Sequence, residues 1–83
     1  MTPADLAAAL GVDVGAIGRD GWGNVACKTG GARWVIDGAP SRDSSHMLHY
    51  EADNTVIQVP ITTTLTAAVT RVRRMLAAYK ENP

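Results

Sequence analysis

The run HMLHYEADNTVIQVPI at residues 46–61 decides the fold of this chain. Its two arms read as β-strands, and Asp53-Asn54 between them tolerates the positive φ of a two-residue hairpin turn. Beyond this hairpin the apolar period changes from two residues to between three and four, which is typical of an amphipathic helix packed on a sheet. The apolar stripe of that helix consists of Leu65, Val69, Val72, Leu76 and Tyr79.

A second hairpin precedes the first one. The runs VACKT (25–29) and ARWVID (32–37) flank Gly30-Gly31, and two glycines suit a tight two-residue turn. In this register Lys28 lies directly opposite Arg33, and like charges in that position destabilise a sheet. We therefore expect either Glu51 from a neighbouring strand or an external anion to lie between the two cations.

A short helix is expected at the start of the chain. Thr2 is a hydroxyl cap, Pro3 suits the first helical position, and Gly11 can end the helix. Five glycines between residues 11 and 24 predict a loop, which can include one helical turn at 14–19. The order helix, four antiparallel strands, helix predicts a single α+β domain over residues 1–83, a two-layer sandwich with a four-stranded antiparallel sheet covered on one face.

The alternation in the later hairpin assigns side chains to the two faces of the sheet. It pairs Tyr50 with Ile57, Leu48 with Val59 and His46 with Ile61, and turns all of them toward the helices. The outward residues of the same hairpin are candidates for partner binding: His49, Glu51 and Gln58. Trp22 stands between two glycines and outside every apolar stripe, so it is either an exposed anchor for a partner or a lid over the edge of the core.

Composition excludes several classes of protein. Eight basic and eight acidic side chains cancel, so the chain lacks the overall charge of a strongly nucleic-acid-binding domain. The single cysteine, Cys27, cannot form an intramolecular disulfide, and His46 and His49 point to opposite faces of a strand, so no metal site or cofactor is expected. Neither a signal peptide nor a membrane span is recognisable, and a reducing cytoplasm is the expected location.

The positive charge is concentrated on the C-terminal helix. Arg71, Arg73 and Arg74 either form a solvated face that complements the helix dipole or bind an anion, together with Lys28 and Arg33 on the sheet. Residues 6–19 also resemble the first two-thirds of a helix-turn-helix motif, which implies DNA reading as an alternative to a plain capping helix and loop.

Residues 45–76 resemble the HicA family of toxin mRNA interferases, whose fold is similar to that of double-stranded-RNA-binding domains. The resemblance rests on Ser45-His46 at the start of a strand, Val59-Pro60 at the end of the next one, and a helix with arginines. Gly21-Trp22 matches a dipeptide of that family. The resemblance implies that His46 is the catalytic acid or base of RNA cleavage.

Two functions therefore remain as expectations. The first is a small non-catalytic module, of the regulator or inhibitor type, that binds a protein through the open sheet face or an edge strand, where a homodimer could also form. The second is an RNA-binding module or degenerate HicA-like enzyme that uses His46. A buried, hydrogen-bonded histidine is the alternative reading of that residue, and the absence of a convergent catalytic set favours the first function.

Overall fold

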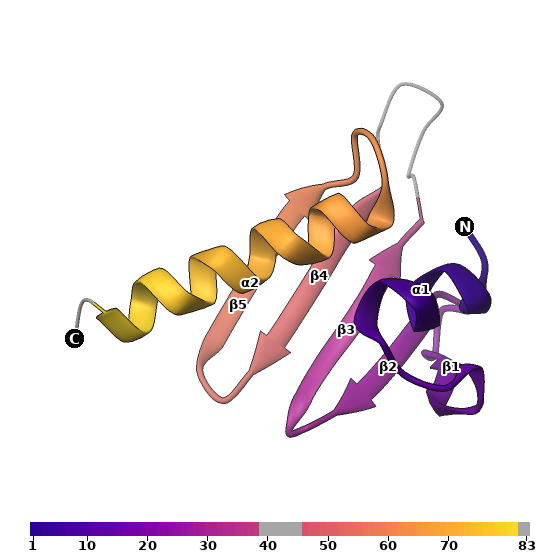
Figure 1. The fold of residues 1–83 in the computed structure, drawn as a ribbon. Helices are drawn as coiled ribbons and strands as arrows, with labels where there is room; N and C mark the ends of the chain where they lie inside the picture. Colours follow the sequence, from indigo (N-terminus) through magenta and orange to yellow (C-terminus); the bar gives the residue numbers. More distant parts are fainter. Residues whose placement is uncertain (39–45, 82–83) are drawn as a thin grey trace.

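A computed structural model describes residues 1–38 and 46–81 of the chain. The N-terminal part contains a helix, one turn of 3-10 helix and three strands, and the C-terminal part contains a hairpin and a long helix (Figure 1). The elements are α1 (Pro3–Leu10), η1 (Val14–Ala16), β1 (Ile17–Arg19), β2 (Val25–Thr29), β3 (Ala32–Asp37), β4 (Met47–Ala52), β5 (Thr55–Pro60) and α2 (Leu65–Glu81).

The five strands form one antiparallel sheet in the order β1-β2-β3-β4-β5, and α1 and α2 lie on the same face of it (Figure 1). This confirms the two-layer α+β architecture, with five strands where four were expected. The added strand is β1, in which Gly18 pairs with Ala26, so the loop expected over 11–24 was wrong at 17–19. Glycine weakens a strand, but an edge strand of three residues is held by the turn that follows it.

The segment after α1 contradicts the helix-turn-helix reading. Gly11 ends α1 with φ 74°, and the next helical element, η1, has only three residues before the chain enters β1. No recognition helix forms there. The start of α1 is as expected: the Thr2 hydroxyl accepts from the Asp5 backbone N–H, and the Asp5 carboxylate accepts from the Thr2 N–H.

Both predicted hairpins have the predicted registers. Lys28 lies opposite Arg33 across β2 and β3, and Tyr50 lies opposite Ile57 across β4 and β5. The two turns adopt the positive φ that their residues allow, with Gly30 at 58° and Asp53 at 53°. Alternation then sends each strand residue to the face expected from the sequence.

The core lies between the sheet and the two helices. Leu6, Leu48 and Val72 are fully buried at its centre, and the Trp34 and Tyr50 rings meet edge to face with centroids 4.8 Å apart. Arg73 connects α2 to the end of α1, because its Nη2 donates a hydrogen bond to the Leu10 carbonyl at 3.3 Å. Its guanidinium also lies 5.9 Å from the centre of the Trp34 ring.

The predicted stripe of α2 is only partly buried. Leu65, Val69 and Val72 contact the core and Leu76 is half-buried, but Tyr79 is 63% exposed. The prediction that Tyr79 packs in the core was therefore wrong. Seventeen residues make a helix of about 25 Å, and its last turns extend past the sheet (Figure 1).

Candidate functional site

The sheet face that points away from α1 and α2, here called the open face, carries mostly polar side chains. β2 contributes Lys28 and β3 contributes Arg33. Val35 on β3 also faces this side, and it is only 3% exposed although it does not belong to the core between the sheet and the helices. Such a buried apolar floor surrounded by polar groups is common in protein interfaces. The remaining described side chains that reach this face include Asp37, His49, Glu51, Val56 and Gln58.

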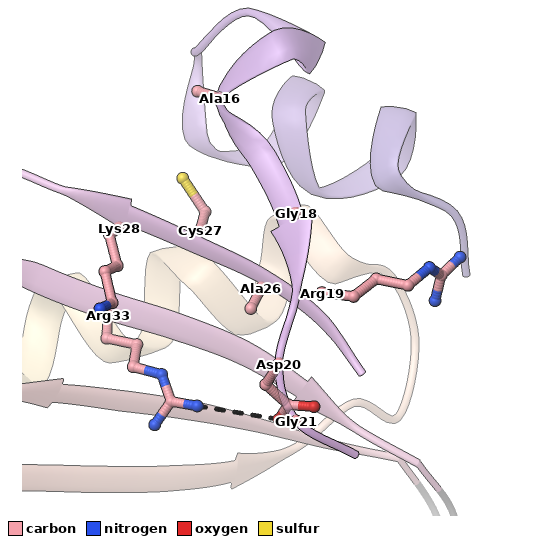
Figure 2. Close-up of a pocket in the computed structure, with 9 residues that line it drawn as sticks. All are labelled: Ala16, Gly18, Arg19, Asp20, Gly21, Ala26, Cys27, Lys28 and Arg33. Carbon is pink, nitrogen blue, oxygen red and sulfur yellow. Dashed lines mark ion pairs between the residues drawn. The ribbon is translucent and has the colours of Figure 1, made fainter. Parts of the chain in front are cut away.

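The turn between β1 and β2 is held by Asp20. Its Oδ1 accepts from the backbone N–H groups of Trp22 and Asn24, both at 2.9 Å, and its Oδ2 accepts from the Asn24 side-chain amide at 3.2 Å. The same Oδ2 lies 3.8 Å from Nη2 of Arg33, an ion pair drawn in Figure 2. Asp20 therefore fixes the turn and ties it to the centre of the sheet.

The charge of Asp20 is stabilised by these contacts. Desolvation opposes ionisation of its side chain, which is 6% exposed. The hydrogen bonds from Asn24 and Trp22 and the charge of Arg33 outweigh that effect, so the pKa of Asp20 lies below its ordinary value of 3.8. A carboxylate with a lowered pKa stabilises the fold above the unfolded pKa, and this contribution disappears as the pH falls through the folded pKa.

We expect Asp20→Asn to lower the melting temperature at pH 7, and the difference from wild type to shrink as the pH falls through the lowered pKa of Asp20. The amide oxygen can still accept the two backbone hydrogen bonds of the turn, but the amide nitrogen in place of Oδ2 cannot accept from Asn24 or pair with Arg33, and the charge is lost. Thermal melts at several pH values measure the difference, with Asp37→Asn on the same face as the control. An equal difference in melting temperature at pH 7 and at low pH would show that the charge of Asp20 has no part in stability.

The open face also shows how Lys28 and Arg33 coexist. Arg33 stands between Lys28 on β2 and Glu51 on β4, so Glu51 does not lie between the two cations, and the external anion expected as the alternative stays a prediction. The carboxylate that contacts Arg33 belongs to Asp20. Asp20 was not among the residues predicted for a site, although an aspartate that opens a glycine-containing turn is a known signal for such a cap.

His49 links two of the other predicted partner-binding residues. Its Nδ1 lies 2.9 Å from Nε2 of Gln58, and its Nε2 lies 3.5 Å from Oε2 of Glu51. Because an amide nitrogen can only donate, His49 Nδ1 is the acceptor in the contact with Gln58. The His49 side chain is 18% exposed. Its contacts with Gln58 and Glu51 hold these three side chains together across β4 and β5.

Trp22 stands at the tip of the β1–β2 turn and is 85% exposed. It forms one wall of a depression of about 290 Å³ on the open face, here called the open-face groove. The prediction left open whether Trp22 is an anchor or a lid, and this exposure excludes the lid. All four predicted partner-binding residues line the groove, whose complete lining is Asp20, Trp22, Arg33, Val35, Asp37, His49, Glu51 and Gln58.

A second depression, of about 480 Å³, adjoins the β1 edge of the same face (Figure 2). Gly18 and Ala26 line it together with Lys28 and Arg33. Arg19 extends away from these cations in Figure 2, and its Nη1 donates to the Gly23 carbonyl at 2.8 Å. Cys27 is buried, and burial raises the pKa of its thiol, so this residue is an unreactive part of the core.

The predicted anion-binding residues do not form one cluster. Lys28 and Arg33 lie on the open face, whereas Arg71 and Arg74 are exposed on α2, in the layer that covers the opposite face. Arg73, the third helix arginine, is held against Leu10 and Trp34.

His46 precedes β4 and is half-buried on the helix side of the sheet. Its carbonyl accepts from the Ile61 N–H at 2.8 Å, which extends the hairpin as predicted. The residue lines a hollow of about 140 Å³ with Asn24 and Ile36. Lys28 and Arg33 lie on the other face, and Ser45 of the HicA-like dipeptide lies outside the described residues.

Among residues 1–38 and 46–81, no group of three or more His, Cys, Asp or Glu side chains could hold a metal ion. Within the same ranges, no helix is both long and apolar enough to cross a membrane. Comparisons with protein-family profiles, with curated proteins and with solved structures find no match to this chain.

Proposed function

We propose that this chain is a small non-catalytic interaction module that binds a protein partner in the open-face groove, with Trp22 as the anchor. The observation that carries the proposal is an 85%-exposed tryptophan on a turn fixed by the Asp20 carboxylate. Tryptophan and arginine dominate the energetics of protein interfaces, and here both line one groove. The one cysteine of the chain, Cys27, is a free buried thiol, and we propose a reducing cytoplasm as the location of the protein because disulfides are rare there.

The groove is preorganised for binding. The contacts of Asp20 with Arg33 and of His49 with Gln58 already hold these side chains, so a partner loses little side-chain entropy when it docks. The charges around the groove are mixed, with Arg33 beside carboxylates. A protein surface with polar groups of both signs fits this lining better than a uniformly anionic nucleic-acid backbone.

The open face supports binding better than the sheet edges do. β1 is an edge strand of only three residues. β5, the other edge, ends at Pro60, which has no N–H to donate to an added strand. These edges limit both strand addition by a partner and an edge-to-edge homodimer.

Affinity capture tests the proposal. Wild-type protein, Trp22→Ala and Tyr79→Ala serve as baits, because both substituted aromatics are exposed and neither contributes to the core. We expect one defined protein to be retained by wild type and Tyr79→Ala, to resist nuclease treatment, and to be lost with Trp22→Ala. Retention of RNA by wild type, or equal retention of the protein by both variants, would contradict the proposal.

The HicA-like alternative depends on His46. His46 lines a hollow with Asn24 and Ile36, and neither Lys28 nor Arg33 lines that hollow, which weighs against His46 acting together with these two cations. We expect wild-type protein to leave RNA intact and His46→Ala to change only stability, by about 1 to 3 kcal/mol. Degradation of RNA by wild type, together with a stable and inactive His46→Ala, would establish the alternative.

A further inference from the structure

The depression at the β1 edge of the open face, here called the β1-side depression, adjoins the open-face groove. Its volume is about 480 Å³, and its lining includes Gly18, Ala26, Lys28, Arg33 and Asp20. Gly18 and Ala26 lie opposite each other across β1 and β2, and because glycine has no side chain and alanine only a methyl group, this part of the face is hollow (Figure 2). Asp20 and Arg33 line both hollows, so a partner that fills the groove reaches the depression at this ion pair.

Lys28 is the cation of this depression that no described carboxylate contacts. Within residues 1–38 and 46–81 no ion pair includes Lys28, whereas Arg33 pairs with Asp20 at 3.8 Å. Lys28 is exposed and lies directly opposite Arg33 across β2 and β3. Like charges in this position destabilise a sheet, and the contact with Asp20 relieves only one of the two cations. An anion beside Lys28 would remove the repulsion that remains.

The charges that line the β1-side depression select a singly charged acid. Lys28 and Arg33 contribute two positive charges and Asp20 contributes one negative charge, whereas Arg19 extends away from them (Figure 2). Glu51, the other acid next to Arg33, lines the groove and is not part of this lining. A single positive charge remains, which matches a carboxylate. A phosphate monoester carries about −1.5 to −2 charges at pH 7 and would leave excess negative charge beside Asp20.

We propose that the β1-side depression binds an aspartate or glutamate side chain of the same protein partner that occupies the open-face groove. The inference rests on the proposed function, because the groove brings the partner to this site. The carboxylate of the partner accepts from the Lys28 ammonium group, and Arg33 adds its charge from the neighbouring strand. A cation at one end of the groove fixes the direction in which the partner docks and excludes partners that place a cation there.

Blocked tripeptides with glutamate, glutamine or phosphoserine between two glycines test the site itself. We expect the glutamate peptide to shift the amide resonances of Gly18, Ala26 and Lys28 in a saturable way, and the glutamine peptide to leave them unchanged. Lys28→Gln should weaken binding of the glutamate peptide at least about fivefold. Lys80→Gln, at an exposed lysine on α2, should bind it like wild type. Because Lys28→Gln removes a like-charge contact, its melting temperature should not fall.

Trp22 does not line the β1-side depression, so Trp22→Ala should bind the glutamate peptide like wild type, and this result is independent of the anchor in the groove. In affinity capture, Lys28→Glu should lose the protein that wild type and Lys80→Glu retain. Equal binding of the glutamate and glutamine peptides, no saturable shift with either, or retention of the captured protein by Lys28→Glu would overturn the proposal and leave the role of Trp22 untouched. Tighter binding of the phosphoserine peptide would also overturn it, in favour of a phosphorylated partner.

Discussion

Leu48→Ala should lower the free energy of unfolding by about 3 to 5 kcal/mol, because it opens a cavity at the centre of the core. Leu48 is fully buried on β4, between the sheet neighbours Ile36 and Val59. A domain of this size has a total stability on the order of 4 to 12 kcal/mol. The variant should therefore be close to unfolding at 37 °C, and denaturant titration measures the loss.

Two variants calibrate this effect. Leu76→Ala on α2 should cost only about 1 to 2 kcal/mol, because Leu76 is half-buried where the helix leaves the sheet. Val56→Ala, at a side chain 59% exposed, should cost less than about 0.5 kcal/mol. If Leu76→Ala were more damaging than Leu48→Ala, the core would be centred near the C-terminal end of α2 instead of around Leu48.

Trp22→Ala should weaken the affinity for the partner by about 2 to 4 kcal/mol, which is roughly 30-fold to 1,000-fold. The side chain is exposed in the free protein, so its removal should leave the melting temperature nearly unchanged. Titration of the captured partner against both proteins measures the difference. Trp22→Phe should fall between them, because it retains part of the apolar area.

A loss of affinity caused by a general change in the surface has to be separated from loss of the anchor. Tyr79→Ala removes an aromatic of similar exposure from the helix layer and should keep wild-type affinity for a partner in the open-face groove. Gln58→Ala should weaken the same complex more modestly, because it releases His49 from its hydrogen bond. A Trp22→Ala protein that binds like wild type would remove Trp22 from the interface.

The parts of the fold that local chemistry determines could be predicted from the sequence. Glycines at 30 and 31 and Asp53-Asn54 specify turns, and those turns fix the register of both hairpins. β1 could not be predicted, because the three residues around Gly18 carry no periodicity and the turn that joins them to β2 is held by side-chain contacts of Asp20. Tyr79 is exposed because the sheet does not extend far enough under α2 to cover it. The spacing of apolar residues along a helix gives no information about the length of the sheet beneath it.

The site shows the same division. Alternation along β4 and β5 placed His49, Glu51 and Gln58 on one face, and the structure joins them with Trp22 in one groove. The ion pair of Asp20 with Arg33 joins residues on separate elements and needs the tertiary register. Arg73 was grouped with the other helix arginines because sequence spacing says nothing about the Leu10 carbonyl that it meets.

The footprint of the bound partner on this chain tests the central claim most directly. Amide resonances of isotopically labelled protein, recorded with and without the unlabelled partner, report which residues the partner covers. We expect the largest changes at Trp22, Arg33, Val35, His49 and Gln58, which line the open-face groove. Changes confined to α2, or to the surroundings of His46, with the groove unaffected, would contradict the account.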